Sequence, residues 1–146
     1  MHNDNLSTLV ERLQLIAEEK LDGEDLRPTI QADAEVFLVD LEPSLLDHLD
    51  KMQPTGYGNP QAVFITRELE VKRSKAVGRD GAHLKMVVND ERFTYDAIAF
   101  NQGHWINQIP QKIDLIYAIE RNDINTRLPY QLNLRDMKPR GLPDEN

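Results

Sequence analysis

Apolar residues recur at helical spacing in the first part of the chain. Thr8 and Glu11 together have the form of a capping box, which favours a helix beginning near residue 8. Gly23 is a natural stop for this helix. Two short extended pieces are expected at 29–32 and 35–39, with Asp33 in the turn between them. The apolar stripe of the predicted helix comprises Leu9, Leu13, Ile16 and Ala17.

A second helix is predicted to begin at Glu42-Pro43, since proline is favoured at the first helical position. Its apolar face comprises Leu45, Leu46, Leu49 and Met52. Regular structure then ends, because Pro54, Gly56, Gly58 and Pro60 follow at short intervals.

From Ala62 the apolar period changes from 3.6 residues to 2, which is typical of strands. The first strand is long enough to require a bulge or a bend. Between the third and fourth strands, residues 101–111 have room for a short helical turn that carries Trp105. The five predicted strands are 63–75, 82–88, 93–100, 113–119 and 130–136.

Five short strands with one helical insert between the third and fourth predict an OB-fold, a five-stranded Greek-key barrel. The fold class is therefore mainly β with a helical lead-in (α+β), a barrel preceded by two helices. A β-sandwich fragment or an SH3-like barrel would give a similar period. The expected organisation is a helical lead-in and connector at 1–60, the barrel at 61–138 and a flexible tail at 139–146.

Composition narrows the class of protein. An apolar fraction of 40% is enough for a hydrophobic core. The chain has no cysteine, which excludes disulfides, thiolate metal sites and a cysteine nucleophile, and favours a cytoplasmic location. No apolar run is long enough for a transmembrane helix, and the first residues do not resemble a signal peptide, so no membrane partner is expected.

The net charge of −8 is unevenly distributed. Residues 1–60 carry 13 Asp and Glu against 4 Lys and Arg, whereas residues 61–140 carry 13 Lys and Arg against 10 Asp and Glu. Such asymmetry is typical of proteins that bind nucleic acid. The same numbers also fit two ordinary solvated surfaces, because the excess of +3 is modest.

Catalytic and metal-binding motifs are not recognisable. The segment Gly56-Tyr57-Gly58-Asn59-Pro60-Gln61 begins like a dinucleotide fingerprint, but Gln61 replaces the last glycine and a strand follows instead of a helix. We interpret this segment as a rigid connector. The four histidines lack metal-ligand spacing, and no Ser, His and Asp arrangement stands out. We therefore predict no catalytic residue and no metal ligand.

Basic residues of the predicted barrel are candidates for nucleic-acid binding. In an OB-fold, strands two and three and the loops 1–2 and 4–5 form the usual binding surface. Single strands need cations for the phosphates and aromatic rings for the bases. The alternatives are a solvated strand edge for each cation and core packing for each ring. The candidate cations are Lys72, Arg73, Lys75, Arg79, His83, Lys85, Arg121 and Arg127, and the candidate rings are Tyr95, Trp105 and Tyr130.

Several motifs in order resemble one family. Gly56, Gly58, Asn59 and Pro60 with Phe64 look like its Gly-x-Gly-Asn-Pro connector. Gly78 with His83-Leu84-Lys85 looks like its glycine turn and His-Leu-Lys strand, and the segments 97–100 and 131–136 fit its later strands. From about Leu26 to Lys138, the chain resembles the RecJ-type single-strand-specific DNA exonucleases of bacteria.

The resemblance implies the C-terminal OB-fold region of such an enzyme, which acts in DNA repair and recombination. The family digests single-stranded DNA from the 5′ end with Mn²⁺ or Mg²⁺ bound in an N-terminal phosphoesterase domain. The Asp-His-His and Gly-Gly-His motifs of its DHH and DHHA1 domains are not in this sequence. We therefore expect no catalytic residue and no cofactor in this chain, and no enzyme activity of its own.

The expected partner is single-stranded DNA, which the barrel would grip and guide towards a nuclease core. The competing hypothesis is a protein-interaction module that docks on a catalytic nuclease chain in trans or on a replication partner, with the acidic helices making the contact.

Overall fold

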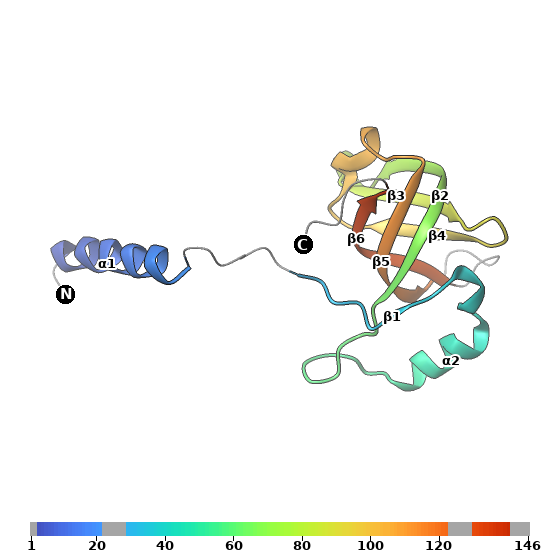
Figure 1. Cartoon of the computed structure of the whole chain (residues 1–146), viewed down its shortest axis with the longest axis horizontal. Coiled ribbons are helices and arrows are strands. Elements are labelled where there is room, and N and C mark those ends of the chain that lie inside the picture. Colours follow the sequence, from blue (N-terminus) through green and yellow to red (C-terminus); the bar gives the residue numbers. More distant parts are fainter. Residues whose placement is uncertain (1–2, 22–28, 123–129, 141–146) are drawn as a thin grey trace.

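A computed structural model describes residues 3–21, 29–122 and 130–140 (Figure 1). Two α-helices, six strands and three short 3-10 helices make up this part of the chain. In chain order the elements are α1 (Asn3–Leu21), β1 (Ala34–Glu35), η1 (Leu38–Asp40), α2 (Pro43–Lys51), β2 (Phe64–Val77), η2 (Arg79–Gly81), β3 (His83–Asn89), β4 (Thr94–Ala99), η3 (Gly103–Asn107), β5 (Lys112–Arg121) and β6 (Tyr130–Pro139).

Five of the strands form a closed barrel in the order β2-β3-β4-β6-β5, and β5 pairs again with β2. The β4–β6 pair is parallel and the other pairs of the barrel are antiparallel. The short helix η3 lies between β4 and β5 in the chain, where the sequence predicted a helical insert. The predicted OB-fold is confirmed.

The strand β2 is shared between two partners. Its first half, up to Glu70, pairs with β5, and its second half, from Glu70 onwards, pairs with β3. Register shifts accompany the change of partner, and Glu68 at the first shift has φ of 61°. The strand therefore bends at bulges, as its length predicted.

The helical lead-in differs from the prediction in detail. The helix α1 begins at Asn3, so Thr8 lies inside the helix and the predicted capping box is wrong. Its end at Leu21 precedes Gly23, which lies outside the described residues. The start of α2 at Pro43 is confirmed.

The two predicted extended pieces are also corrected. Residues 29–32 form no strand, and in place of a strand at 35–39 the chain has β1 and then η1. The strand β1 pairs in parallel with Phe64 and Ile65 of β2. The helix η1 begins at Leu38, because the Asp40 carboxylate accepts a hydrogen bond from the Phe37 N–H at 2.8 Å.

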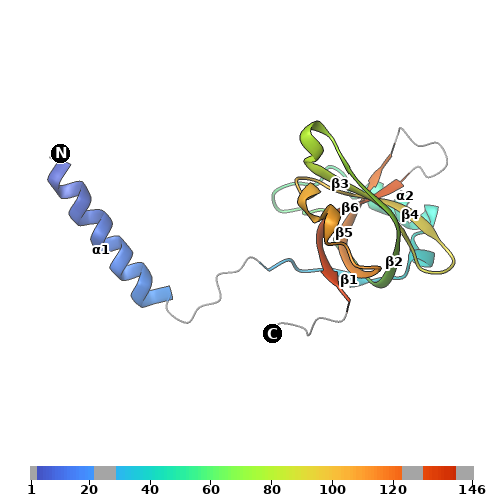
Figure 2. The same ribbon diagram turned by 90° about the horizontal axis from the view of Figure 1, so that it is seen from above.

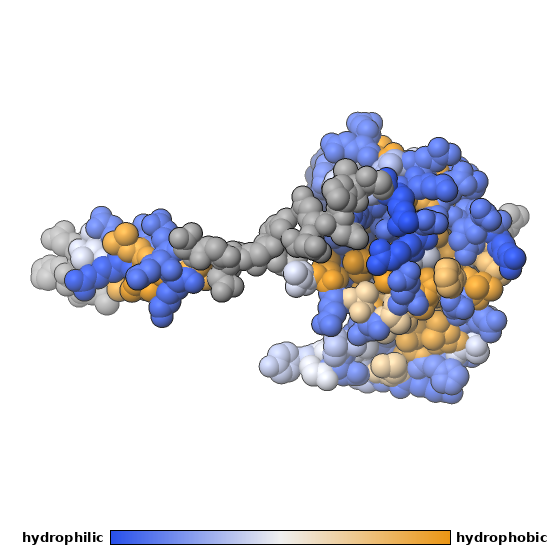
Figure 3. Space-filling view, in the orientation of Figure 1, coloured by the Kyte–Doolittle hydropathy of each residue, from blue (hydrophilic) through white to orange (hydrophobic). Residues whose placement is uncertain are grey.

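α1 stands apart from the barrel in two perpendicular views (Figures 1 and 2). Every side chain from residue 6 to residue 21 is exposed, including the apolar ones visible in Figure 3. None of the described helices has the length and apolar character needed to span a bilayer.

The barrel core contains a buried pair of hydroxyl groups. Thr66 donates a hydrogen bond to the Val36 carbonyl at 2.8 Å, so the Tyr117 hydroxyl donates to Thr66, also at 2.8 Å. Tyr117 is fully buried, and its burial raises the pKa of the phenol to about 12. The pair joins β5 through β2 to the segment that follows β1.

The Tyr117→Phe variant should lower the free energy of unfolding by about 1 kcal/mol near neutral pH, the usual net value of one hydrogen bond. Thr66 would keep its bond to Val36. Because the pKa is raised in the folded state, this phenol contributes stability below about pH 10 that is lost as the pH rises through about 12. Urea unfolding of both proteins across this range should show a smaller alkaline loss in the variant.

Tyr57→Phe is the matched control, since Tyr57 is fully exposed. If the wild type and Tyr117→Phe lose equal unfolding free energy at alkaline pH, the loss does not come from ionisation of Tyr117.

Candidate nucleic-acid interface

Three basic side chains meet on the outer surface of the β2–β3 hairpin. Leu84, Met86 and Val88 of β3 point into the core, so the alternate residues point outward. Lys75 pairs directly with Lys85, and Arg73 pairs with Val87, which places these side chains on that outer side. We call Arg73, Lys75 and Lys85 the basic face. It contains three of the candidate cations predicted from the sequence.

The electrostatics of the basic face favour an anion. Arg73 and Lys75 are exposed, and neither has an ion-pair partner among the described residues. Lys85 lies 3.6 Å from Asp96 of β4, and its side chain is 36% exposed. Two cations are therefore available to solvent beside a third that one carboxylate partly neutralises.

Two other candidate cations flank this face. Lys72 lies at the second bulge of β2 and contacts Glu70 at 2.8 Å, a bond that lowers the pKa of Glu70. Arg79 is exposed in η2, the turn that joins β2 to β3. It thus occupies loop 1–2 of the barrel, at the end of the basic face.

His83 is held tightly by its surroundings. Its Nδ1 accepts a hydrogen bond from the Asn101 N–H at 3.0 Å, so the neutral ring carries its proton on Nε2. A Cβ on Gly78 would lie only 2.7 Å from the His83 ring, and Gly78 has φ of 82°. Glycine is therefore favoured at 78 for both conformation and space, which gives a structural reason for the pairing of Gly78 with His83 in this chain.

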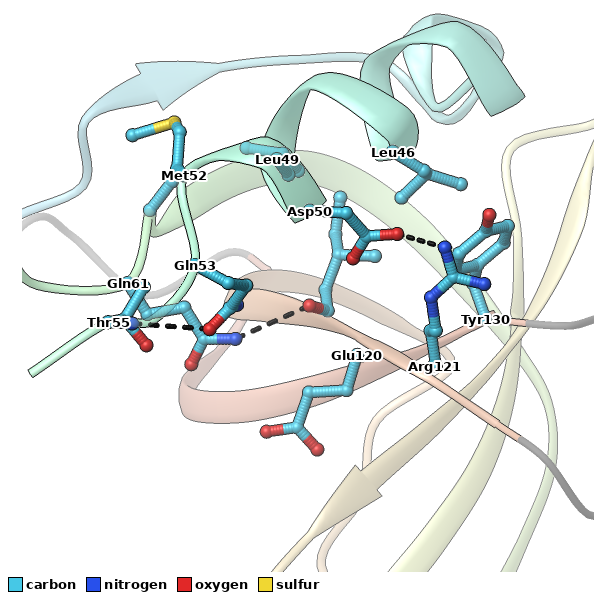
Figure 4. A pocket seen from close by; sticks show the side chains of 12 residues that line it. Leu46, Leu49, Asp50, Met52, Gln53, Thr55, Gln61, Glu120, Arg121 and Tyr130 are labelled. Atoms are coloured by element: carbon cyan, nitrogen blue, oxygen red, sulfur yellow. Dashed lines mark hydrogen bonds and ion pairs between the residues drawn. The ribbon is translucent and has the colours of Figure 1, made fainter.

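Arg121 lies at the end of β5 beside α2, away from the basic face. Its guanidinium binds the Asp50 carboxylate, and this hydrogen bond raises the pKa of Arg121 (Figure 4). Its Cζ also lies 5.8 Å from the centre of the Tyr130 ring. Leu46, Leu49 and Ile119 complete a pocket here between α2 and the barrel. Arg127 lies outside the described residues.

The three candidate rings occupy different environments. Tyr95 packs against the core, its hydroxyl donates to the Leu41 carbonyl at 2.9 Å, and its burial raises its pKa. Trp105 of η3 also packs against the core. Only Tyr130, in the pocket with Arg121, lies beside a candidate cation.

Comparison with known proteins identifies the family. A family model described as the RecJ OB domain matches residues 32–136. The chain belongs to the RecJ OB-domain family. It is 24% identical over 135 residues to the single-stranded-DNA-specific exonuclease RecJ of Bacillus subtilis, a match that covers 91% of this chain and 17% of that protein.

Two crystal structures of Thermus thermophilus RecJ have the same fold. The structure with Mn²⁺ matches at 20% identity with a TM-score of 0.59, covering 75% of this chain and 16% of that one. The structure with Mg²⁺ matches at 21% identity with a TM-score of 0.61, covering 83% and 19%. This chain therefore spans less than a fifth of the length of these RecJ proteins.

The connector motif of this RecJ OB domain has a structural role. The backbones of Gly56 and Asn59 exchange two hydrogen bonds, at 2.8 and 3.0 Å, and Gly58 between them has φ of 81°. The Asn59 side-chain amide donates to the carbonyls of Met52 and Pro54. Pro60 leads into β2, whose first residue Phe64 is buried. The motif is thus a tight turn tied to the end of α2.

Two residues near the basic face were missed by the sequence analysis. Gly103 of η3 is buried, and a Cβ there would lie 1.7 Å from the Gly81 carbonyl oxygen. Phe100, directly after β4, is 49% exposed and contacts His83. Gly103 has no local signal, whereas Phe100 follows two inward alanines at strand period and could have been placed on the outer side. Within residues 3–21, 29–122 and 130–140, no three His, Cys, Asp or Glu side chains are grouped to hold a metal ion.

Proposed function

We propose that this RecJ OB domain binds single-stranded DNA along the outer surface of β2 and β3 and guides it to a nuclease core. The observation that carries the proposal is the basic face, where paired strands place Arg73, Lys75 and Lys85 together. The usual ligand surface of an OB-fold is formed by its second and third strands, here β3 and β4, with loops 1–2 and 4–5. Lys85 and Arg79 belong to that surface, and Arg73 and Lys75 lie on the strand next to it. The Bacillus subtilis relative is itself named as specific for single-stranded DNA.

In this proposal the contact is mainly electrostatic. Phosphates of the single strand displace counterions from the basic face, so the affinity falls as salt rises. Three phosphate contacts give a slope of log K against log salt of about −2 for a single strand. Hydrolysis is assigned to a metal-dependent catalytic core of the RecJ type.

Fluorescence anisotropy tests the proposal. The purified chain is titrated into a labelled single-stranded oligonucleotide at several salt concentrations, with the same sequence as a duplex for comparison. We expect binding that prefers the single strand and has the slope given above. No binding at the lowest salt, or equal binding to the duplex, would contradict the proposal.

The Asp50→Asn variant should bind single-stranded DNA more tightly. Asp50 holds the Arg121 guanidinium beside Tyr130, so its neutralisation releases a cation next to an aromatic ring. We expect a gain of up to about fivefold at low salt, since an exposed ion pair contributes about 1 kcal/mol or less. Anisotropy titrations measure the change.

Asp47→Asn is the matched control for Asp50→Asn. Asp47 lies on the same helix and is exposed. Its charge contributes less than that of Asp50 to the raised pKa of Arg121, and its replacement removes the same charge while the bond between Asp50 and Arg121 is kept. Equal gains in the two variants would show a general charge effect, and no gain for Asp50→Asn would exclude Arg121 from the path.

A second function, protein docking, is favoured by α1. Leu6, Leu9, Leu13 and Ile16 recur at intervals of three and four residues, and each is 48–55% exposed. Most of the stability of a helix in a protein comes from packing of its apolar side, and that side of α1 is exposed. We infer that α1 packs on a catalytic nuclease chain of the RecJ type.

Sedimentation of this chain with a purified RecJ-type nuclease core that lacks its own OB domain tests the docking. We expect a complex that the Leu9→Glu, Leu13→Glu double variant abolishes. A complex that survives these substitutions would place the contact elsewhere.

A further inference from the structure

Phe100 is an exposed aromatic ring at one end of the basic face. The preceding β4 residues Ala97 and Ala99 point into the core, and Ile98 pairs with Lys85 on the outer side. Phe100 continues this outward alternation one position beyond the strand, and 49% of its surface is exposed. A half-exposed phenyl ring thus lies on the sheet surface that carries the cations.

Phe100 has a rigid support. Its ring meets the His83 ring edge-on, with 5.2 Å between the centroids and an angle of 72° between the planes. His83 in turn is fixed by the Asn101 N–H and by the close approach of Gly78. A ring held in this way loses little conformational freedom when it stacks on a ligand.

Phe100 also has the right neighbours for a nucleotide. Strand pairing places Val77 and His83 in one row, and Lys75 and Lys85 in the next row along the same strands. Residues two apart on a strand are separated by roughly 7 Å. A base on Phe100 would therefore bring the adjoining phosphates within reach of these long cationic side chains.

We propose that Phe100, supported by His83, is the base-stacking site of this domain, and that it contacts single-stranded nucleic acid through the face of one base without reading its sequence. This inference rests on the proposed function. It assigns base contact to a residue outside the set predicted from the sequence. Stacking of this kind tolerates any base, because every base has a π-face.

Other rings on the described barrel are less suited to this role. Tyr95 and Trp105 pack against the core, and Tyr117 is fully buried. Tyr130 lies in the α2 pocket beside Arg121, which Asp50 binds. Phe100 combines exposure, a fixed support and an adjoining row of cations.

Two ligands separate stacking from phosphate binding: a labelled single-stranded oligonucleotide, and a strand of the same length whose sugars carry no bases. We expect Phe100→Leu to weaken binding of the normal strand about tenfold, with the salt slope unchanged, because one stacked base contributes about that much. Binding of the abasic strand should not change. Phe100→Trp should keep the affinity, and its added fluorescence should be quenched when the normal strand binds.

Phe93→Leu is the matched control. Phe93 precedes β4 at its opposite end and is 40% exposed, so the same substitution there should leave both affinities unchanged. Thermal melting of each variant checks that the fold is kept.

Equal affinity of Phe100→Leu and the wild type for the normal strand, or equal losses on the normal and abasic strands, would overturn the stacking site. In either case, salt-sensitive binding by the wild type would leave the proposed function intact. A wild type that binds neither strand would overturn both.

Discussion

Replacing Arg73, Lys75 and Lys85 together by alanine should weaken binding of single-stranded DNA by about a hundredfold at low salt and make the salt slope shallower by about 2. The three side chains lie on adjacent, paired strands, so one DNA backbone can contact all of them. Each lost phosphate contact also removes the release of its counterions, which is why affinity and slope change together. Anisotropy titrations over a salt series measure both quantities.

The triple variant should remain folded. Arg73 and Lys75 are exposed, and Lys85 loses only one partly exposed ion pair with Asp96, which costs about 1 kcal/mol or less. The control is the Lys51→Ala, Arg92→Ala, Lys112→Ala protein, which has the same change in net charge at three other exposed positions. If both triple variants lose affinity equally, the effect is one of overall charge. If neither loses affinity, the basic face is not the binding surface.

Gly103→Ala should strongly destabilise the folded protein. The new Cβ would lie 1.7 Å from the Gly81 carbonyl oxygen, and this neighbour is backbone, so it cannot rotate away. The Gly103 N–H also donates to the Ala82 carbonyl at 3.0 Å, which holds η3 against the turn before β3. We expect a loss of about 3 kcal/mol and a fall in melting temperature on the order of 10–20 °C.

Gly56→Ala is the appropriate comparison for Gly103→Ala. A Cβ at Gly56 meets no atom within 4 Å, and both substitutions restrict the unfolded chain equally. The Gly56 variant should therefore melt within a few degrees of the wild type. Calorimetry measures the melting temperatures of the two variants. Equal values would mean that η3 does not approach the η2 turn this closely.

The features that local pattern predicted correctly are those whose cause is local. The alternation of His83, Lys85 and Val87 with Leu84, Met86 and Val88 is a property of one segment. The structure places β3 at His83–Asn89, close to the predicted strand 82–88, with the apolar set buried.

The features that pattern missed depend on residues far apart in the chain. The bond between Arg121 and Asp50 is one example, because the two residues are 71 positions apart and no local pattern reveals such a pair. The role of Arg121 in DNA binding stays a prediction. Gly103 is constrained by the backbone at Gly81, and β1 is a strand because Phe64 and Ile65 lie beside it. Phe100 was not among the candidate rings. Its outward position could have been predicted from strand alternation, but its ring contact with His83 across the strand pair could not.

The change of partner within β2 has a consequence for how this surface can be altered. Residues 64–70 close the barrel against β5, whereas Arg73 and Lys75 lie farther along the same strand, where only β3 pairs with it. Ser74 and Ala76 on the other side of β2 are exposed, whereas their pairing partners Met86 and Leu84 on β3 are buried, so only the β2 strand of this hairpin lies outside the core. The charge at the exposed positions of β2 can therefore vary, by natural drift or by design, without repacking the barrel that supports it.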